Sequence, residues 1–128
     1  MVDLDRLELV LIRAARDGRP MTYGQLLAFF ERRVTRITVA ALCRDLARVE
    51  ERRAGERWPD LACLVVRKSD GLPGEGYFSA LREEGHYAGP SVGPPAEAFV
   101  RARQAVARRW AKACAAAWAE AGPAPPAG

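Results

Sequence analysis

The residue with the greatest capacity for chemistry in this 128-residue chain is a cysteine inside an apolar run, Cys63. Alkyl or acyl transfer needs a thiolate, which forms at neutral pH when a base or a positive charge lowers the pKa of the thiol. Ala62 and Leu64, the neighbours of Cys63, are apolar, and such surroundings raise that pKa. We therefore expect Cys63 to be a buried core residue and the protein not to be an enzyme.

The other cysteines and the single histidine lack the spacing of a metal site. Cys43, Cys63 and Cys114 include no CxxC pair, and His86 has no cysteine beside it. Structural zinc needs such clusters, so we expect no metal and no cofactor. An odd number of scattered cysteines is typical of a reducing compartment. Because no apolar run approaches the roughly 20 residues that span a bilayer, the sequence indicates a cytoplasmic protein without a membrane partner.

Arginine side chains form the pattern with the clearest functional meaning. Lys and Arg total 20 against 16 Asp and Glu, and the resulting net charge of +4 favours anionic partners. In a helix expected over residues 38–53, the spacing of Arg44, Arg48 and Arg52 places them opposite the apolar seam. This stripe indicates a nucleic-acid contact surface. The alternative interpretation is an ordinary solvated face, partly paired with nearby acidic residues.

The start of that helix strengthens the first interpretation. If Thr38 caps the helix, the free amides of its first turn favour a phosphate, which Arg36 and Thr38 would flank. Arg44 would then reach a base edge, with a preference for guanine. Arg67 and Lys68 end an apolar segment further along the chain, where a basic pair is suited to following the DNA backbone.

Helical periodicity and capping signals predict the elements that carry these residues. We expect a helix over residues 4–17, stopped by Gly18, and a second that starts at Thr22, where Gln25 completes a capping box. Apolar and β-branched residues predict a strand over 61–68, and Tyr77-Phe78 would begin a returning strand after a glycine-rich turn. A long helix over 96–120 and a disordered tail over 121–128 complete the chain.

This order predicts an α+β, winged helix-turn-helix-like domain over residues 1–120, with three helices, a β-hairpin and a long C-terminal helix. In such folds the third helix enters the major groove and the ribbon lies along the backbone or minor groove. A generic α+β domain, in which the hairpin merely covers the helices, is the alternative.

Three segments of this domain read TYGQL at 22–26, VAALCR at 39–44 and ACLVVRKSDG at 62–71. Over about residues 21–78 the chain thereby resembles the DNA-binding domain of alkylguanine-DNA alkyltransferases and alkyltransferase-like proteins. The resemblance implies that Tyr23 crowds a DNA phosphate and that Arg44 fills the stack vacated by a rotated nucleotide. The family's catalytic P-C-H-R motif is absent, because Cys63 is followed by Leu64 instead of histidine.

The sequence therefore predicts a non-enzymatic protein that binds double-stranded DNA as a regulator, an architectural protein or a damage-recognition factor. The expected contacts are Tyr23, Arg36, Thr38, Arg44, Arg48, Arg67 and Lys68. An alternative is a protein-interaction module on the same scaffold, which would bind a partner chain or a second copy of itself. Trp58 or Trp118, together with Tyr77 and Tyr87, would supply the aromatic anchors for a partner chain. A cysteine-dependent alkyl transferase is the third hypothesis, and it requires an alkylated-guanine duplex to label Cys63.

Overall fold

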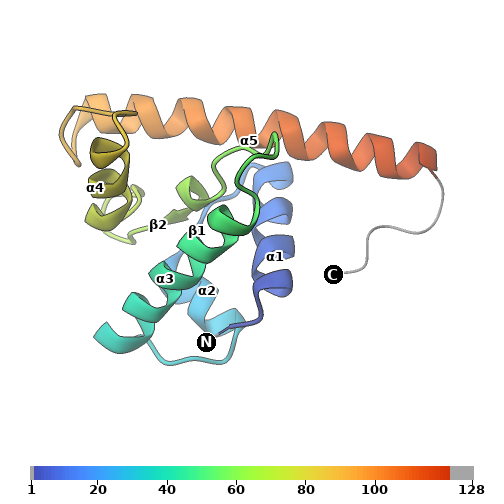
Figure 1. Ribbon diagram of the computed structural model, residues 1–128. Coiled ribbons are helices and arrows are strands. Elements are labelled where there is room, and N and C mark those ends of the chain that lie inside the picture. Colours follow the sequence, from blue (N-terminus) through green and yellow to red (C-terminus); the bar gives the residue numbers. More distant parts are fainter. Residues whose placement is uncertain (1, 122–128) are drawn as a thin grey trace.

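The computed structural model describes the backbone of residues 2–121 and the side chains of residues 2–115. The long helix α5 (Pro94–Ala121) runs along one side of the molecule, and α1 packs against it (Figure 1). The remaining elements lie beneath α5 and build the rest of the domain. In chain order they are α1 (Leu4–Asp17), β1 (Met21–Thr22), α2 (Tyr23–Phe29), α3 (Arg36–Arg52), the 3-10 turn η1 (Ala62–Leu64), β2 (Val65–Val66) and α4 (Glu75–Glu83).

Helix α1 has the bounds that its sequence predicts. The Asp3 carboxylate accepts hydrogen bonds from the first amides, and Gly18 ends the helix in the left-handed conformation at φ 65°. A side chain at Gly18 would be strained there, and it would also meet the guanidinium of Arg108 on α5 at about 3.2 Å. Leu7 and Leu11 are fully buried, so α1 is a central core helix.

The capping boxes of α2 and α3 set the start of each helix. At α2, Thr22 and Gln25 exchange backbone-to-side-chain hydrogen bonds of 3.0 Å, as predicted. At α3 the cap is Thr35 and not Thr38, so the prediction for this position is wrong. Thr38 is the third residue of the helix, and its hydroxyl accepts from the Thr35 amide at 2.8 Å. The sequence Thr-x-x-Thr allowed either threonine to cap, and only the reciprocal bond distinguishes them.

The predicted β-hairpin is wrong. Val65 and Val66 form a strand, but it pairs in parallel with Met21–Thr22, and in residues 2–121 these two strands are the whole sheet. Both valines are buried, as expected of a parallel strand covered on two faces. Residues 77 and 78, expected to begin the returning strand, lie in α4. The fold is α+β, predominantly helical, with a small parallel sheet.

Helical spacing explains why residues 75–83 do not form a strand. Phe78 and Leu81 are the buried residues of α4, and their separation by three positions puts both on one helical face. Glu75 in the first turn and Arg82 in the last have the charges that interact favourably with the helix dipole. The two side chains also form an ion pair at 3.0 Å. Tyr77 and Phe78 each have a preference for strands, but the free energy gained by burying one face of the helix is larger than this preference.

Helix α5 holds the domain together. Its predicted range, 96–120, is extended by two residues at the start and one at the end. Small side chains make up much of its buried stripe, namely Ala96, Val100, Ala107 and Ala111, and let it approach α1 closely. The predicted disordered tail, apart from Ala121, lies outside the described residues. No helix in residues 2–121 is both long and apolar enough to cross a membrane.

Candidate nucleic-acid interface

The amino end of α3 carries the first group of exposed cations. Arg36 is the first residue of the helix, and Arg33 lies three positions earlier in the connection from α2. The Thr38 hydroxyl lies within hydrogen-bonding distance of the Arg33 carbonyl, and the Thr35 amide bonds back to Thr38. These contacts fix the connection to the helix, so both arginines extend from an ordered backbone. Arg33 was not among the predicted contacts, although its position beside a helix start could have indicated it.

Arg44 continues this basic surface along α3. It is exposed two turns after Arg36, and in the described part of the chain neither residue forms an ion pair. Arg48 differs, because its guanidinium bonds to the buried carboxylate of Asp45 at 3.2 Å. The predicted stripe is therefore only partly available, with Arg36 and Arg44 the stronger candidates for phosphate contact.

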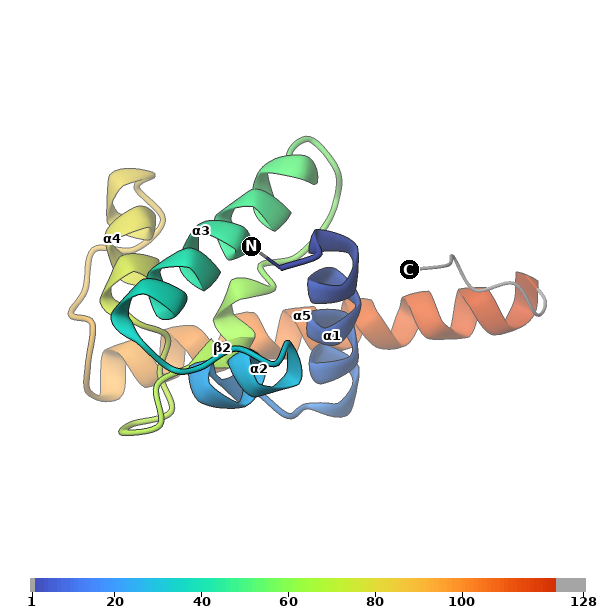
Figure 2. The ribbon, with the colours of Figure 1, turned by 90° about the horizontal axis from the view of Figure 1, so that it is seen from below.

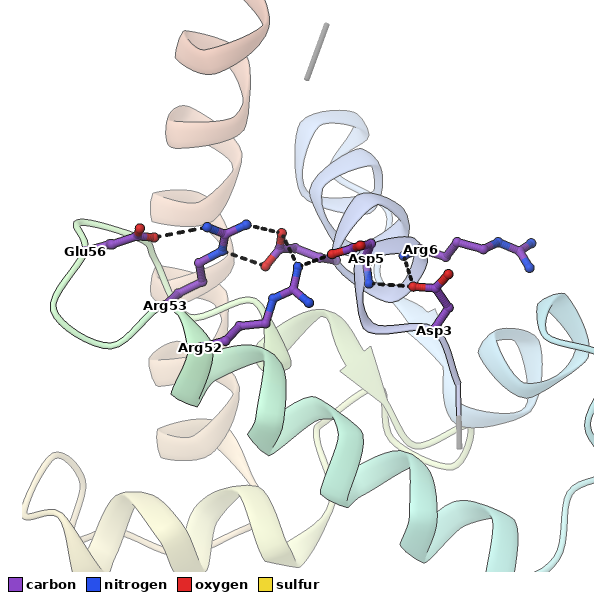
Figure 3. Close-up of polar contacts among 7 residues, drawn as sticks. Asp3, Asp5, Arg6, Arg52, Arg53 and Glu56 are labelled. Carbon is purple, nitrogen blue, oxygen red and sulfur yellow. Dashed lines mark hydrogen bonds and ion pairs between the residues drawn. The ribbon is translucent and has the colours of Figure 1, made fainter. Parts of the chain in front are cut away.

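Arg52, the third member of the predicted stripe, faces α1 instead of solvent. Its Nη2 atom lies 2.5 Å from a carboxylate oxygen of Asp5 and 3.3 Å from one of Glu8. Arg53 binds both carboxylate oxygens of Glu8, at 2.6 and 2.9 Å, and reaches Glu56 at 3.3 Å (Figure 3). This group of acids and arginines joins the end of α3 to α1, so its charges stabilise the fold and are not free for a ligand.

The loop that follows β2 was expected to be the wing of the fold. Arg67 ion-pairs with Asp70 at 2.9 Å and donates to the Ser91 carbonyl at 3.2 Å, so it holds the loop closed. Lys68 is exposed next to it. Of the predicted basic pair, only Lys68 is therefore available to an anion.

Tyr23 joins this loop to α2 and α3. Its hydroxyl accepts a hydrogen bond from the Gly74 amide at 3.0 Å, and a side chain at Gly74 would meet that oxygen at 3.1 Å. Burial raises the pKa of Tyr23, and the nearby Cys43 adds to this effect. The amino end of α3, the α2–α3 connection and the loop after β2 lie on one side of the molecule (Figure 2). Arg36 begins the helix that carries Arg44, and Lys68 lies in the loop whose Gly74 amide bonds to Tyr23. We call these four residues, which those segments carry, the basic face.

A cleft of about 860 Å³ opens beside the basic face, between α3 and α4. Tyr23 and Arg44 line it at the side of the basic face, and Trp58, Leu61 and Leu81 supply apolar walls. Asp60, only 10% exposed, organises the deeper part. Its carboxylate accepts from the Tyr77 hydroxyl, from Arg103 at 3.0 Å and from the Cys63 amide at 3.2 Å. A cleft of this size suits a small molecule or a single nucleotide base.

Glu50, on α3, also lines the cleft and lies close to Asp60. Burial raises its pKa to about 7, and the carboxylates of Asp60 and Glu84 contribute in the same direction, whereas Arg103 opposes them. Glu50 is therefore partly protonated at neutral pH. Neither residue stands out in the sequence, because they are ten positions apart and on different elements.

The raised pKa of Glu50 predicts a loss of stability with rising pH. The unfolded chain releases this proton near pH 4.5, whereas the folded protein keeps it to about pH 7. The free energy of unfolding should therefore fall between these values and then level off. Glu50→Gln should stabilise the protein at pH 8, by about 1 kcal/mol because solvent screens part of the effect, and hardly at all at pH 4. Urea unfolding at both values, with Glu51→Gln as the control, tests this; an unchanged pH profile would contradict it.

Cys63 does not line the cleft. It is fully buried, and its thiol donates to the Asp60 backbone carbonyl at 3.1 Å. Burial, and then the negative charge of Asp60, raise its pKa well above the ordinary value. Within residues 2–121, no group of three or more His, Cys, Asp or Glu side chains is arranged to hold a metal ion.

Thiol labelling tests the inertness that this environment predicts. We expect Ellman's reagent to modify the exposed Cys43 and the half-buried Cys114 in the native protein, and Cys63 only after unfolding. An alkylated-guanine duplex should leave the intact mass unchanged. A mass increase that maps to Cys63 would reverse this conclusion and restore the alkyl transferase hypothesis.

Three of the aromatic anchors proposed for a protein partner are engaged inside the fold. Trp58 packs on Trp110 with ring centroids 4.7 Å apart and lies beneath the Arg53 guanidinium. Tyr77 bonds to Asp60, and Tyr87 packs against Phe99 at 4.4 Å. The fourth, Trp118, lies beyond the side chains that are described. The described aromatic residues thus do not favour the interaction-module alternative.

No family model, curated protein or solved structure matches this chain. The assignment of a function therefore depends on the geometry of the basic face and its cleft.

Proposed function

We propose that this protein binds double-stranded DNA through the basic face, without catalysing a reaction. The observation that carries the proposal is the placement of Arg36 and Arg44 along the amino half of one helix, both exposed and, among the described residues, without ion pairs. Arginines of this kind provide both phosphate contacts and bidentate contacts to guanine. Arg33 and Lys68 border them and add to the positive potential.

In this proposal α2 and α3 are the two helices of a helix-turn-helix, with α3 on the duplex. The loop after β2, with Lys68, takes the position that a wing would occupy. The likeness of residues 21–78 to alkyltransferase-like proteins supports this orientation, since it assigns both Tyr23 and Arg44 to DNA. The burial of Cys63 supports a binding role instead of alkyl transfer.

Damage recognition is the role that the neighbouring cleft favours. An extrahelical base could enter beside Tyr23 and Arg44 and be held between apolar walls, above the carboxyl groups of Glu50 and Asp60. Extrusion costs least where a base is already mispaired or modified, and this difference selects for damaged sites.

Fluorescence anisotropy of a labelled duplex, titrated at several salt concentrations, tests the proposal. Four neutralised phosphates predict a slope of about −3.6 in log affinity against log salt. A second duplex with one O6-alkylated guanine should bind more tightly than the unmodified one if the cleft receives the base. Equal affinities would remove damage recognition but keep DNA binding. Absence of binding even at low salt would remove DNA binding itself.

A further inference from the structure

Two large apolar side chains project into solvent at the amino end of α3. Ile37, the second residue of the helix, is 78% exposed, and Val34, just before the cap, is 64% exposed. These are the highest values among the large apolar residues described. Val34 leans towards α2, where a methyl group on Gly24 would lie 3.7 Å from its Cγ2 atom. The pair forms an apolar projection, which we call the Ile37–Val34 ridge.

Val34 immediately precedes the cap, where an apolar side chain can pack against the first turn, but the fold gives no such reason for Ile37. The first turn of a helix exposes free amides and favours polar or acidic side chains, and a β-branched residue gains nothing there without a packing partner. An exposed apolar pair of this kind therefore indicates contact with another molecule.

The charges around the ridge identify that molecule. Arg33 and Arg36 directly precede Val34 and Ile37 in the sequence, so the cations and the apolar residues share one short segment. Neither arginine has an ion pair in the described residues. A polyanion that also offers apolar surface fits both features, and the stacked bases of a DNA duplex lie between two rows of phosphates.

We propose that Ile37, backed by Val34, is a wedge that inserts between adjacent base pairs while Arg33 and Arg36 hold the flanking phosphates. This inference rests on the proposed function and adds to it a specific intercalating residue. In proteins that bind the minor groove, apolar wedges partly unstack one base step and kink the duplex by about 20–90°. The protein would therefore bend DNA and would favour steps that unstack easily, such as TA and CA.

Ile37→Ala separates the wedge from the phosphate contacts. Because Ile37 is exposed, the variant should fold normally. It should bind a duplex about tenfold more weakly, with the salt slope unchanged since no charge is lost. Ile37→Leu, which keeps the apolar volume, should restore most of the affinity. Val92→Ala, an exposed apolar residue just before α5, is the matched control and should bind as the wild type does.

Two structural readouts on DNA complete the test. Energy transfer between dyes at the duplex ends should report a bend with the wild type and a straighter duplex with Ile37→Ala. The fluorescence of a 2-aminopurine placed at a TA step should increase only with the wild type, because the base unstacks.

If Ile37→Ala binds, bends and unstacks DNA as the wild type does, the wedge is wrong while DNA binding stands. If the wild type binds no duplex, the proposed function fails and the wedge with it. If sedimentation shows a dimer that Ile37→Ala dissociates, the ridge is a self-association surface and the wedge is wrong.

Discussion

Replacing Arg36 and Arg44 together by alanine is expected to weaken duplex binding about 100-fold at low salt, at about 1.4 kcal/mol for each contact. Both side chains are exposed on α3 and form no ion pair with any side chain that the structure describes, so their loss should leave the fold intact. The slope of log affinity against log salt should become shallower by about two units, since each neutralised phosphate contributes about 0.9. Anisotropy titrations of wild type and variant over the same salt range measure both quantities.

A charge-matched control separates this result from a general loss of positive charge. Arg101 and Arg109 are exposed on α5, which runs along the side of the molecule opposite the amino end of α3 (Figure 1). The double variant Arg101→Ala, Arg109→Ala removes the same charge and should keep most of the affinity and the slope. If both double variants lose affinity equally, binding is diffuse and the basic face is not the interface. If neither does, α3 does not contact the duplex.

Glu8→Ala should destabilise the protein markedly. The Glu8 side chain is 7% exposed and holds two arginines that are each 30% exposed. Breaking a fully buried pair costs about 3–5 kcal/mol; the partial exposure of these arginines reduces this to about 2–3 kcal/mol. We expect a fall in Tm of about 10 °C, measured by circular dichroism at pH 7.

The pH dependence of this effect has a definite sign. Burial by itself raises the pKa of Glu8, but the hydrogen bonds and charges of Arg53 and Arg52 outweigh it, and the pKa is lowered overall. Its contribution to stability is therefore complete above the unfolded value of 4.5 and is lost as the pH falls through the lower folded value. The difference between wild type and Glu8→Ala should shrink in acid. Glu51→Ala, an exposed acid on α3, is the control; an equal loss of Tm in both would contradict the special role of Glu8.

Local signals predicted α1, α2 and α5 well, whereas the cap of α3 was misplaced and α4 was missed. Asp3 and Gly18 mark the ends of α1, and the Thr22–Gln25 capping box marks the start of α2, because caps act over three or four residues and leave a direct trace in the sequence. The long periodic segment of α5 was predicted to within two residues at either end. The charge balance was also readable without coordinates, whereas the element order was predicted only in part, because a helix, α4, occupies the place of the expected returning strand.

The β-hairpin shows where local signals fail. The run 61–68 has the composition of a strand, but which strand it pairs with depends on Met21–Thr22, more than 40 positions earlier. Parallel pairing at that distance leaves no turn signature, whereas a hairpin would need one. Tyr77-Phe78 has β propensity, yet the core accepts Phe78 and Leu81 from a helix. Propensity spans a smaller free-energy range than burial of two large side chains, so burial decides.

The sequence by itself determined the number and sign of the charges, the capped helices and the apolar surroundings that make Cys63 a core residue. Only the tertiary structure decided which cations remain available to a ligand. Arg52 and Arg67 are held by carboxylates, and Arg48 is partly so, whereas Arg36 and Arg44 stay free of ion pairs. The cleft with Glu50 and Asp60 likewise forms only when α3 and α4 meet. Ion pairs form between charges a few ångströms apart in space. The separation of two residues along the chain does not give their distance in the folded protein, so the sequence could not show which charges pair.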